Sequence, residues 1–189
     1  MREEHVRVSG HIAGIWDIDP VHSHVGFSAR HLMVSKVHGR FTRFEGQIVT
    51  GANPAESSAT ATIDTTSLDT GNAQRDEDIK GENFLSVADY PAMTYRSTGI
   101  HPRGDGYRLD GELTIKGVTR PVVLELQVNG FGPDPYGATR AGFSASGEIN
   151  REDFGLAANM TLPGGGLVVS REIQLMIEVE AALRRVGQE

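Results

Sequence analysis

The sequence predicts an all-β fold, a sandwich or barrel of antiparallel strands with one short helix. Two observations support this fold class. Glycine is abundant in the 189-residue chain, with 23 residues, and β-branched residues recur in short alternating runs; this combination is typical of all-β domains. The alternation places apolar residues on one side of each run and polar residues on the other. Such strands belong to a sheet with one dry face and one wet face.

Four runs show this alternation most clearly. Each has an apolar set at every second position, and the intervening positions are mostly charged or polar. The runs are residues 25–31, 109–116, 141–150 and 172–180. In the first run, Val25, Phe27, Ala29 and His31 share one face. We expect these four apolar sets to face one common interior.

Turn signals predict how two pairs of strands are joined. Lys116 and Gly117 fit a two-residue hairpin turn that pairs Ile115 with Val118, Gly111 with Val122 and Leu109 with Leu124. This register keeps the apolar residues on one face. Pro121 then lies on the outer face, where its missing N–H requires a bulge or an unpaired position.

A second hairpin is expected to join residues 24–31 to 37–44 through a loop at 32–36, with Phe27 opposite Phe41 and Ala29 opposite Gly39. After Phe41 the apolar positions change parity, which predicts a bulge near Thr42 and Arg43.

Residues 72–81 predict the short helix, since Asn72 can cap its start and a glycine follows its last turn. Phe84 and Leu85 are then expected to fold back onto the end of the barrel. The Gly- and Pro-rich segments 130–137 and 151–166 are expected to be long loops.

Composition excludes several classes of function. The length predicts one domain over 1–189, with 1–13 as an N-terminal extension. The formal charge of -7, with both signs interspersed, gives no electrostatic footprint for nucleic acid or for an anionic membrane. Cysteine is absent, which excludes thiolate catalysis, cysteine metal sites and disulfides. No stretch is apolar enough for a signal peptide or an integral membrane helix, so we expect a cytoplasmic protein.

Seven sequence blocks, in order along the chain, resemble those of the YceI-like, polyisoprenoid-binding family. They are residues 16–20 with 22–27, 31–35 with 39–41, 63–72, 75–76, 90–95, 111–121 and 150–155. The resemblance covers the chain from about Trp16 to Val179. It implies an extended, lipocalin-like antiparallel barrel of about eight strands with a lipid-filled interior, often in a homodimer. It also implies a long-chain isoprenoid or acyl lipid as ligand, no cofactor and no catalytic residue.

Ten residues are our candidates for contact with such a ligand: Phe27, His31, Val37, Phe41, Arg75, Phe84, Met93, Leu113, Ile115 and Phe143. The apolar members would equally well fill a solid core, and the sequence leaves that choice open. For the charged residues, Arg75 and Arg151 fit either an anionic lipid head or internal ion pairs, and we favour ion pairing for Arg151. His22 and His24 would share a strand face and could bind a metal together, but we expect no metal site.

Three functions remain open at this point. The first, which we favour, is binding, sequestration or transfer of a long-chain amphiphile without chemistry. The second is an enzyme of the same fold that acts on a bound isoprenoid or acyl compound through His24, His31 or Arg75. The third is a structural or stress-protective interaction domain, which predicts a solid interior and a large exposed apolar patch.

Overall fold

The computed structural model, which describes residues 8–158, 168–185 and 187, is a closed antiparallel β-barrel. Its wall runs in the order β1-β4-β5-β7-β8-β9-β10-β11-β2-β3-β6, and β1 also pairs with β11 to close it. The strands are β1 (Gly14–Ile18), β2 (His24–His31), β3 (Ser35–Phe41), β4 (Phe44–Thr50), β5 (Ser58–Asp64), β6 (Leu68–Asp69), β7 (Ala92–Arg103), β8 (Gly106–Ile115), β9 (Val118–Pro133), β10 (Thr139–Asn150) and β11 (Val169–Leu183).

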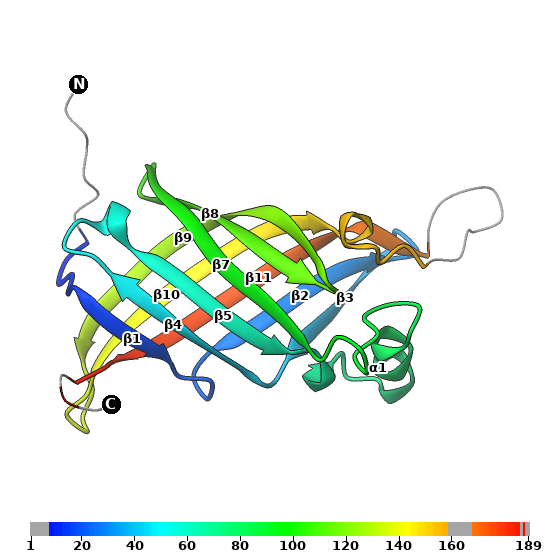
Figure 1. Cartoon of the computed structure of the whole chain (residues 1–189), viewed down its shortest axis with the longest axis horizontal. Helices are drawn as coiled ribbons and strands as arrows, with labels where there is room; N and C mark the ends of the chain where they lie inside the picture. Colours follow the sequence, from blue (N-terminus) through cyan, green and yellow to red (C-terminus); the bar gives the residue numbers. More distant parts are fainter. Residues whose placement is uncertain (1–7, 159–167, 186, 188–189) are drawn as a thin grey trace.

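The barrel has eight strands when its interrupted strands are counted once. β1 and β2 lie one after the other along β11, and β4 and β3 follow them on the other side. β6 is a two-residue bridge beside β3. The barrel is elongated, and α1 (Ala73–Lys80) lies at one end of it (Figure 1). The expected lipocalin-like architecture of about eight strands with one short helix is therefore confirmed.

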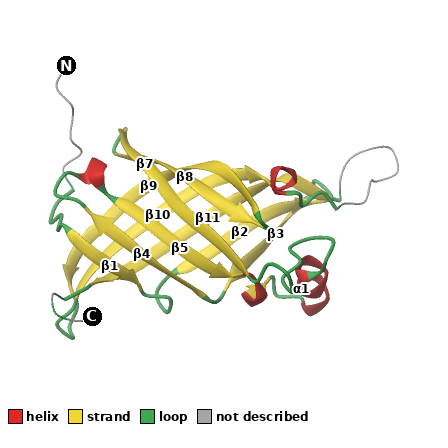
Figure 2. Cartoon of the chain, in the orientation of Figure 1, coloured by secondary structure: helices red, strands yellow, loops and turns green. Residues whose placement is uncertain are grey.

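The short helical turns also lie at the ends of the barrel rather than in its wall (Figure 2). They are η1 (Pro54–Glu56), η2 (Thr65–Ser67) and η3 (Arg151–Phe154). In the described part of the chain, no helix is long and apolar enough to cross a membrane.

The predicted strand faces and the β8–β9 hairpin are confirmed. Ile115 pairs with Val118, Gly111 with Val122 and Leu109 with Leu124. Lys116 and Gly117 both have positive φ angles, 50° and 74°, as a two-residue hairpin turn requires. Pro121 lies opposite Glu112 without a register shift, so the bulge is not formed. The pairing of β9 with β10 starts only at Leu124, and Pro121 therefore occupies an unpaired ladder position toward β10.

The predicted register of the β2–β3 hairpin is wrong by two residues. Phe27 pairs with Gly39, Ala29 with Val37, and Phe41 with Val25. A shift of two residues leaves every side chain on the same face, so the apolar pattern cannot detect it. The loop is only residues 32–34, because Leu32 and Met33 adopt left-handed conformations. Neither is a residue type that signals such a turn.

The predicted bulge at Thr42 and Arg43 is instead a break between β3 and β4. Ser67 of η2 satisfies the backbone there: its carbonyl accepts from the Thr42 N–H at 3.2 Å and its hydroxyl accepts from the Arg43 N–H at 3.0 Å. The apolar positions do change parity here, and the cause is the η2 segment, which is distant in sequence and bonds to both residues of the break.

The helix prediction is confirmed, with Asn72 as N-cap accepting from the Arg75 N–H and Gly81 as C-cap. Phe84 and Leu85 do fold back and join the core. The loop predicted at 130–137 is wrong in its first half, since β9 continues to Pro133. The one predicted at 151–166 begins with η3, and its residues 159–166 lie outside the described residues. So do residues 1–7 of the predicted N-terminal extension.

Candidate ligand-binding site

The barrel encloses a cavity of about 1020 Å³. Its lining residues come from both ends of the barrel: His11 and Pro54 lie at one end, and Arg75 and Leu156 at the other. Most of the lining is contributed by apolar side chains of the strands. An apolar cavity of this size, with few polar groups, is typical of a small-molecule or lipid site.

Inward glycines allow large side chains to lie flat against the wall. The Phe27 ring lies over Gly39, where a Cβ would come within 2.3 Å of it. The Tyr95 ring lies over Gly111 in the same way, 2.4 Å from such a Cβ. Because these rings follow the wall rather than point to the barrel axis, space remains along the axis.

All ten residues predicted as ligand contacts line this cavity: Phe27, His31, Val37, Phe41, Arg75, Phe84, Met93, Leu113, Ile115 and Phe143. Phe41, Met93, Leu113, Ile115 and Phe143 are buried, and the other five are less fully covered. The structure thus brings together all the candidates, and their role as ligand contacts stays a prediction.

Arg75 is tied by hydrogen bonds to Thr70, the residue that follows β6, and among the described residues it makes no ion pair. Its guanidinium donates to the hydroxyl and the carbonyl of Thr70, each at 2.8 Å. Asp76 accepts from the Thr70 N–H and hydroxyl. This network holds α1 against the end of the barrel, where Arg75 lines the cavity.

Arg151 is a buried cation at the same end, with 2 % of its surface exposed. It donates to the backbone carbonyls of Ser170 at 2.9 Å, Leu156, Ala158 at 3.3 Å and Val169 at 3.4 Å. The expected ion pair is wrong: among the described residues no carboxylate lies within ion-pair distance of its guanidinium, and burial lowers the Arg151 pKa. Its charge also lies 5.5 Å from the centre of the Phe84 ring, a cation–π distance.

Tyr95 also lines the cavity, although it is not among the ten candidates from the sequence. Its hydroxyl is buried and has no hydrogen-bond partner among the described residues. Burial and the nearby Asp110 raise the Tyr95 pKa to about 12. The signal was present in the sequence, because Tyr95 follows the inward Met93 by two positions on one strand.

An aromatic cluster packs the wall toward the other end of the barrel. Trp16 is fully buried and donates from Nε1 to the Thr50 hydroxyl at 2.8 Å. The Phe131 ring packs against Trp16 at 5.4 Å and against His11 at 5.4 Å between ring centroids. The two ends of the cavity therefore differ: aromatic rings dominate here, and arginines lie at the α1 end.

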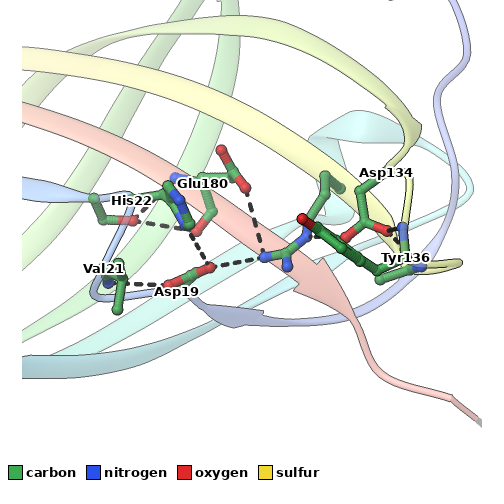
Figure 3. Close-up of polar contacts among 9 residues, drawn as sticks. Asp19, Val21, His22, Asp134, Tyr136 and Glu180 are labelled. Atoms are coloured by element: carbon green, nitrogen blue, oxygen red, sulfur yellow. Dashed lines mark hydrogen bonds and ion pairs between the residues drawn. The ribbon is translucent and has the colours of Figure 1, made fainter.

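The histidine pair considered as a metal site is not formed on one strand. His22 lies in the turn between β1 and β2, whereas His24 begins β2. His22 Nδ1 contacts Asp19 at 2.9 Å, and the two group with Glu180 (Figure 3). Arg140 occupies the same cluster, 2.8 Å from Asp19 and 3.5 Å from Glu180. Arg140 therefore already contacts the two carboxylates that a metal would use.

Comparison with known proteins decides the family. A family model described as the YceI-like domain matches residues 16–181. The chain belongs to the YceI-like family. Curated YceI-like relatives include a UPF0312 protein of Yersinia pestis (strain Pestoides F), 38 % identical over 165 residues that cover 87 % of this chain and 83 % of the relative. Protein YceI of Escherichia coli is 38 % identical over 170 residues, 89 % of this chain and 86 % of that protein.

Solved structures agree with the YceI-like fold. Burkholderia cenocepacia BcnA superposes with a TM-score of 0.75 at 25 % identity, over 86 % of this chain and 98 % of that one. The Campylobacter jejuni YceI protein has a TM-score of 0.72 at 30 % identity, over 82 % and 90 %. A polyisoprenoid-binding domain from Saccharophagus degradans shares the fold at 16 % identity, with a TM-score of 0.67 over 92 % and 100 %.

Proposed function

We propose that this YceI-like barrel binds one long-chain amphiphilic lipid, of isoprenoid or acyl type, and sequesters or transfers it without chemistry. The observation that carries the proposal is the apolar cavity of about 1020 Å³ that continues between the two ends of the barrel. A polyisoprenoid-binding domain, 16 % identical, has the same fold, which shows that a barrel of this architecture is used in a protein of that description.

The energetics of such binding need no catalytic group. Burial of each methylene contributes about 0.8 kcal/mol, so a chain of about fifteen carbons gains on the order of 12 kcal/mol before ordering costs are subtracted. Two of the polar groups at the α1 end, Arg75 and Arg151, have donors committed to Thr70 and to backbone carbonyls. This arrangement favours a carrier over an enzyme that acts through Arg75.

The alternative of a purely structural domain predicts an interior filled by side chains. The cavity argues against it. Transfer to an acceptor and assembly as a homodimer stay predictions of the family resemblance.

The test is to identify what the protein carries. We expect native mass spectrometry of the purified full chain to show a one-to-one complex with a long-chain amphiphile, and an organic extract to contain that species. Delipidated protein should take up one equivalent of a long-chain isoprenoid or acyl probe. Repeated extracts without such a species, together with no uptake of either probe, would refute the proposal.

A further inference from the structure

The β2–β3 hairpin ends in three exposed apolar side chains, which we call the apolar tip: Leu32, Met33 and Val34. Their exposed fractions are 38 %, 59 % and 82 %. Single exposed apolar residues are common on soluble proteins. Three consecutive exposed apolar residues at the end of a hairpin are uncommon. The β2–β3 hairpin ends at the same end of the barrel as α1 (Figure 1).

The backbone holds these side chains outward. Leu32 and Met33 have φ angles of 52° and 59°, a left-handed conformation that glycine or asparagine adopts more easily. The turn is fixed on both sides, because the Leu32 N–H donates to the Val168 carbonyl at 2.9 Å and the Val34 N–H to the His31 carbonyl at 3.1 Å. Strained backbone of this kind is found preferentially at functional positions.

Two cations flank the apolar tip. Arg30 and Lys36 lie directly opposite each other on β2 and β3 and are both exposed. Like charges at such a pair of positions are unfavourable. In the part of the chain that the structure describes, neither is within ion-pair distance of a carboxylate, although the whole chain has a charge of -7. Apolar side chains beside unpaired cations are the combination that binds an anionic membrane surface.

The apolar tip is continuous with the end of the cavity. His31 precedes the tip in the chain and Val168 accepts a hydrogen bond from Leu32, and both line the cavity. Arg30 of β2 and Val37 of β3, on the strands that carry the tip, line it too. A surface that contacts the apolar tip would therefore lie beside this end of the cavity.

We propose that the apolar tip, together with Arg30 and Lys36, docks on the surface of an anionic lipid bilayer and places this end of the cavity against it. That the contact serves to load or unload the cavity rests on the proposed function; the docking itself does not. The net charge of -7 gave no indication of binding to an anionic membrane. It is a sum over the whole chain, and it hides the local positive charge of Arg30 and Lys36. The acidic residues of α1 lie at the same end. An anionic surface would repel them, so the proposed contact is made by the hairpin and not by α1.

The test is flotation of the purified full chain with phosphatidylcholine vesicles that contain or lack phosphatidylglycerol. We expect binding to the anionic vesicles only, weakened by salt. Val34→Ser should weaken it about tenfold through lost apolar burial, and Lys36→Glu by a similar or larger factor through reversed charge. The matched control is Val21→Ser: Val21 is 83 % exposed but lies in the turn between β1 and β2, and its loss should leave binding within about twofold.

Absence of binding to anionic vesicles, or equal losses for Val34→Ser and Val21→Ser, would overturn the inference. So would a Val34→Ser variant that loses only self-association in sedimentation, since the tip would then contact a second copy. Uptake of a soluble long-chain probe without vesicles is measured in parallel, and Val34→Ser should preserve it. If the wild type takes up no probe, the proposed function fails, whereas docking is judged by flotation alone.

Discussion

At the scale of single residues, Arg151 has the most demanding environment in the described structure. Among the described residues this buried guanidinium has no ion-pair contact with a carboxylate, and backbone carbonyls from two separate segments, 156–158 and 169–170, surround it instead. The charge thus serves as a cross-link between η3 and the start of β11. The Arg151 guanidinium thus bonds to backbone carbonyls, where the sequence predicted an ordinary ion pair.

We predict that Arg151→Met lowers the free energy of unfolding by about 2–4 kcal/mol, because several buried carbonyls lose their donor at once. The matched control is Arg171→Met, which removes an exposed arginine paired with Glu152 at 3.1 Å and should cost less than about 1 kcal/mol. Urea denaturation of both variants measures the difference. Equal losses of unfolding free energy in the two variants would show that the hydrogen bonds of Arg151 to these carbonyls stabilise the fold no more than an exposed ion pair does.

Tyr95 supplies a prediction of opposite sign. A buried hydroxyl without a partner is unfavourable, so Tyr95→Phe should leave the unliganded protein as stable as the wild type or up to about 1 kcal/mol more stable. Chemical denaturation of delipidated protein checks this. A clear loss of stability would mean that the hydroxyl has a partner in solution.

At the scale of elements, the turn between β1 and β2 is held by a charged cluster. Asp19 accepts from the Val21 N–H at 3.0 Å, His22 Nδ1 lies 2.9 Å from it, and Arg140 lies 2.8 Å from it. Hydrogen bonding to His22 is the largest cause that lowers the Asp19 pKa to about 2, and the same contact raises the His22 pKa above 6.5.

These shifts predict a pH window for the turn. The raised His22 pKa stabilises the fold below about pH 6.5 and this contribution is lost as pH rises through the folded-state pKa. The lowered Asp19 pKa contributes above about pH 4 and is lost toward pH 2. The melting temperature of the wild type should therefore exceed that of His22→Gln most near pH 5, and the gap should shrink by pH 8. A gap that is constant or widens toward pH 8 would contradict this account.

Elements that depend on local signals were predictable from the sequence. The β8–β9 register followed from Gly117 and the apolar pattern, and α1 followed from Asn72 and Gly81. The β2–β3 register did not, because its turn uses Leu32 and Met33 in a conformation their residue types do not signal. The break at Thr42 and Arg43 depends on Ser67, which is distant in sequence, and no local pattern reveals such a contact.

At the scale of the whole molecule, the alternation of apolar and polar residues predicted which side chains face the barrel interior. It did not predict whether those side chains fill the interior or leave a cavity. All ten candidate contacts do line the cavity. For the eight that lie on strands, the reason is that parity determines the face of a strand, whereas Arg75 and Phe84 reach the cavity from α1 and the segment that follows it. Whether those side chains leave a hollow depends on how they lie along the wall, as Phe27 does over Gly39 and Tyr95 over Gly111. These are packing details between neighbouring strands, and a single sequence does not contain them explicitly.

The hollow interior is the central claim, and filling it tests that claim most directly. Ala145 lines the cavity on β10, and the adjacent Ser146 is exposed on the outer face. Titration of delipidated protein with a fluorescent long-chain probe should show one site in the wild type and in Ser146→Trp. Ala145→Trp, folded by circular dichroism, should lose at least about tenfold in affinity because the indole occupies the ligand's space. Unchanged affinity in folded Ala145→Trp would mean that the probe binds elsewhere and that the cavity is not the site.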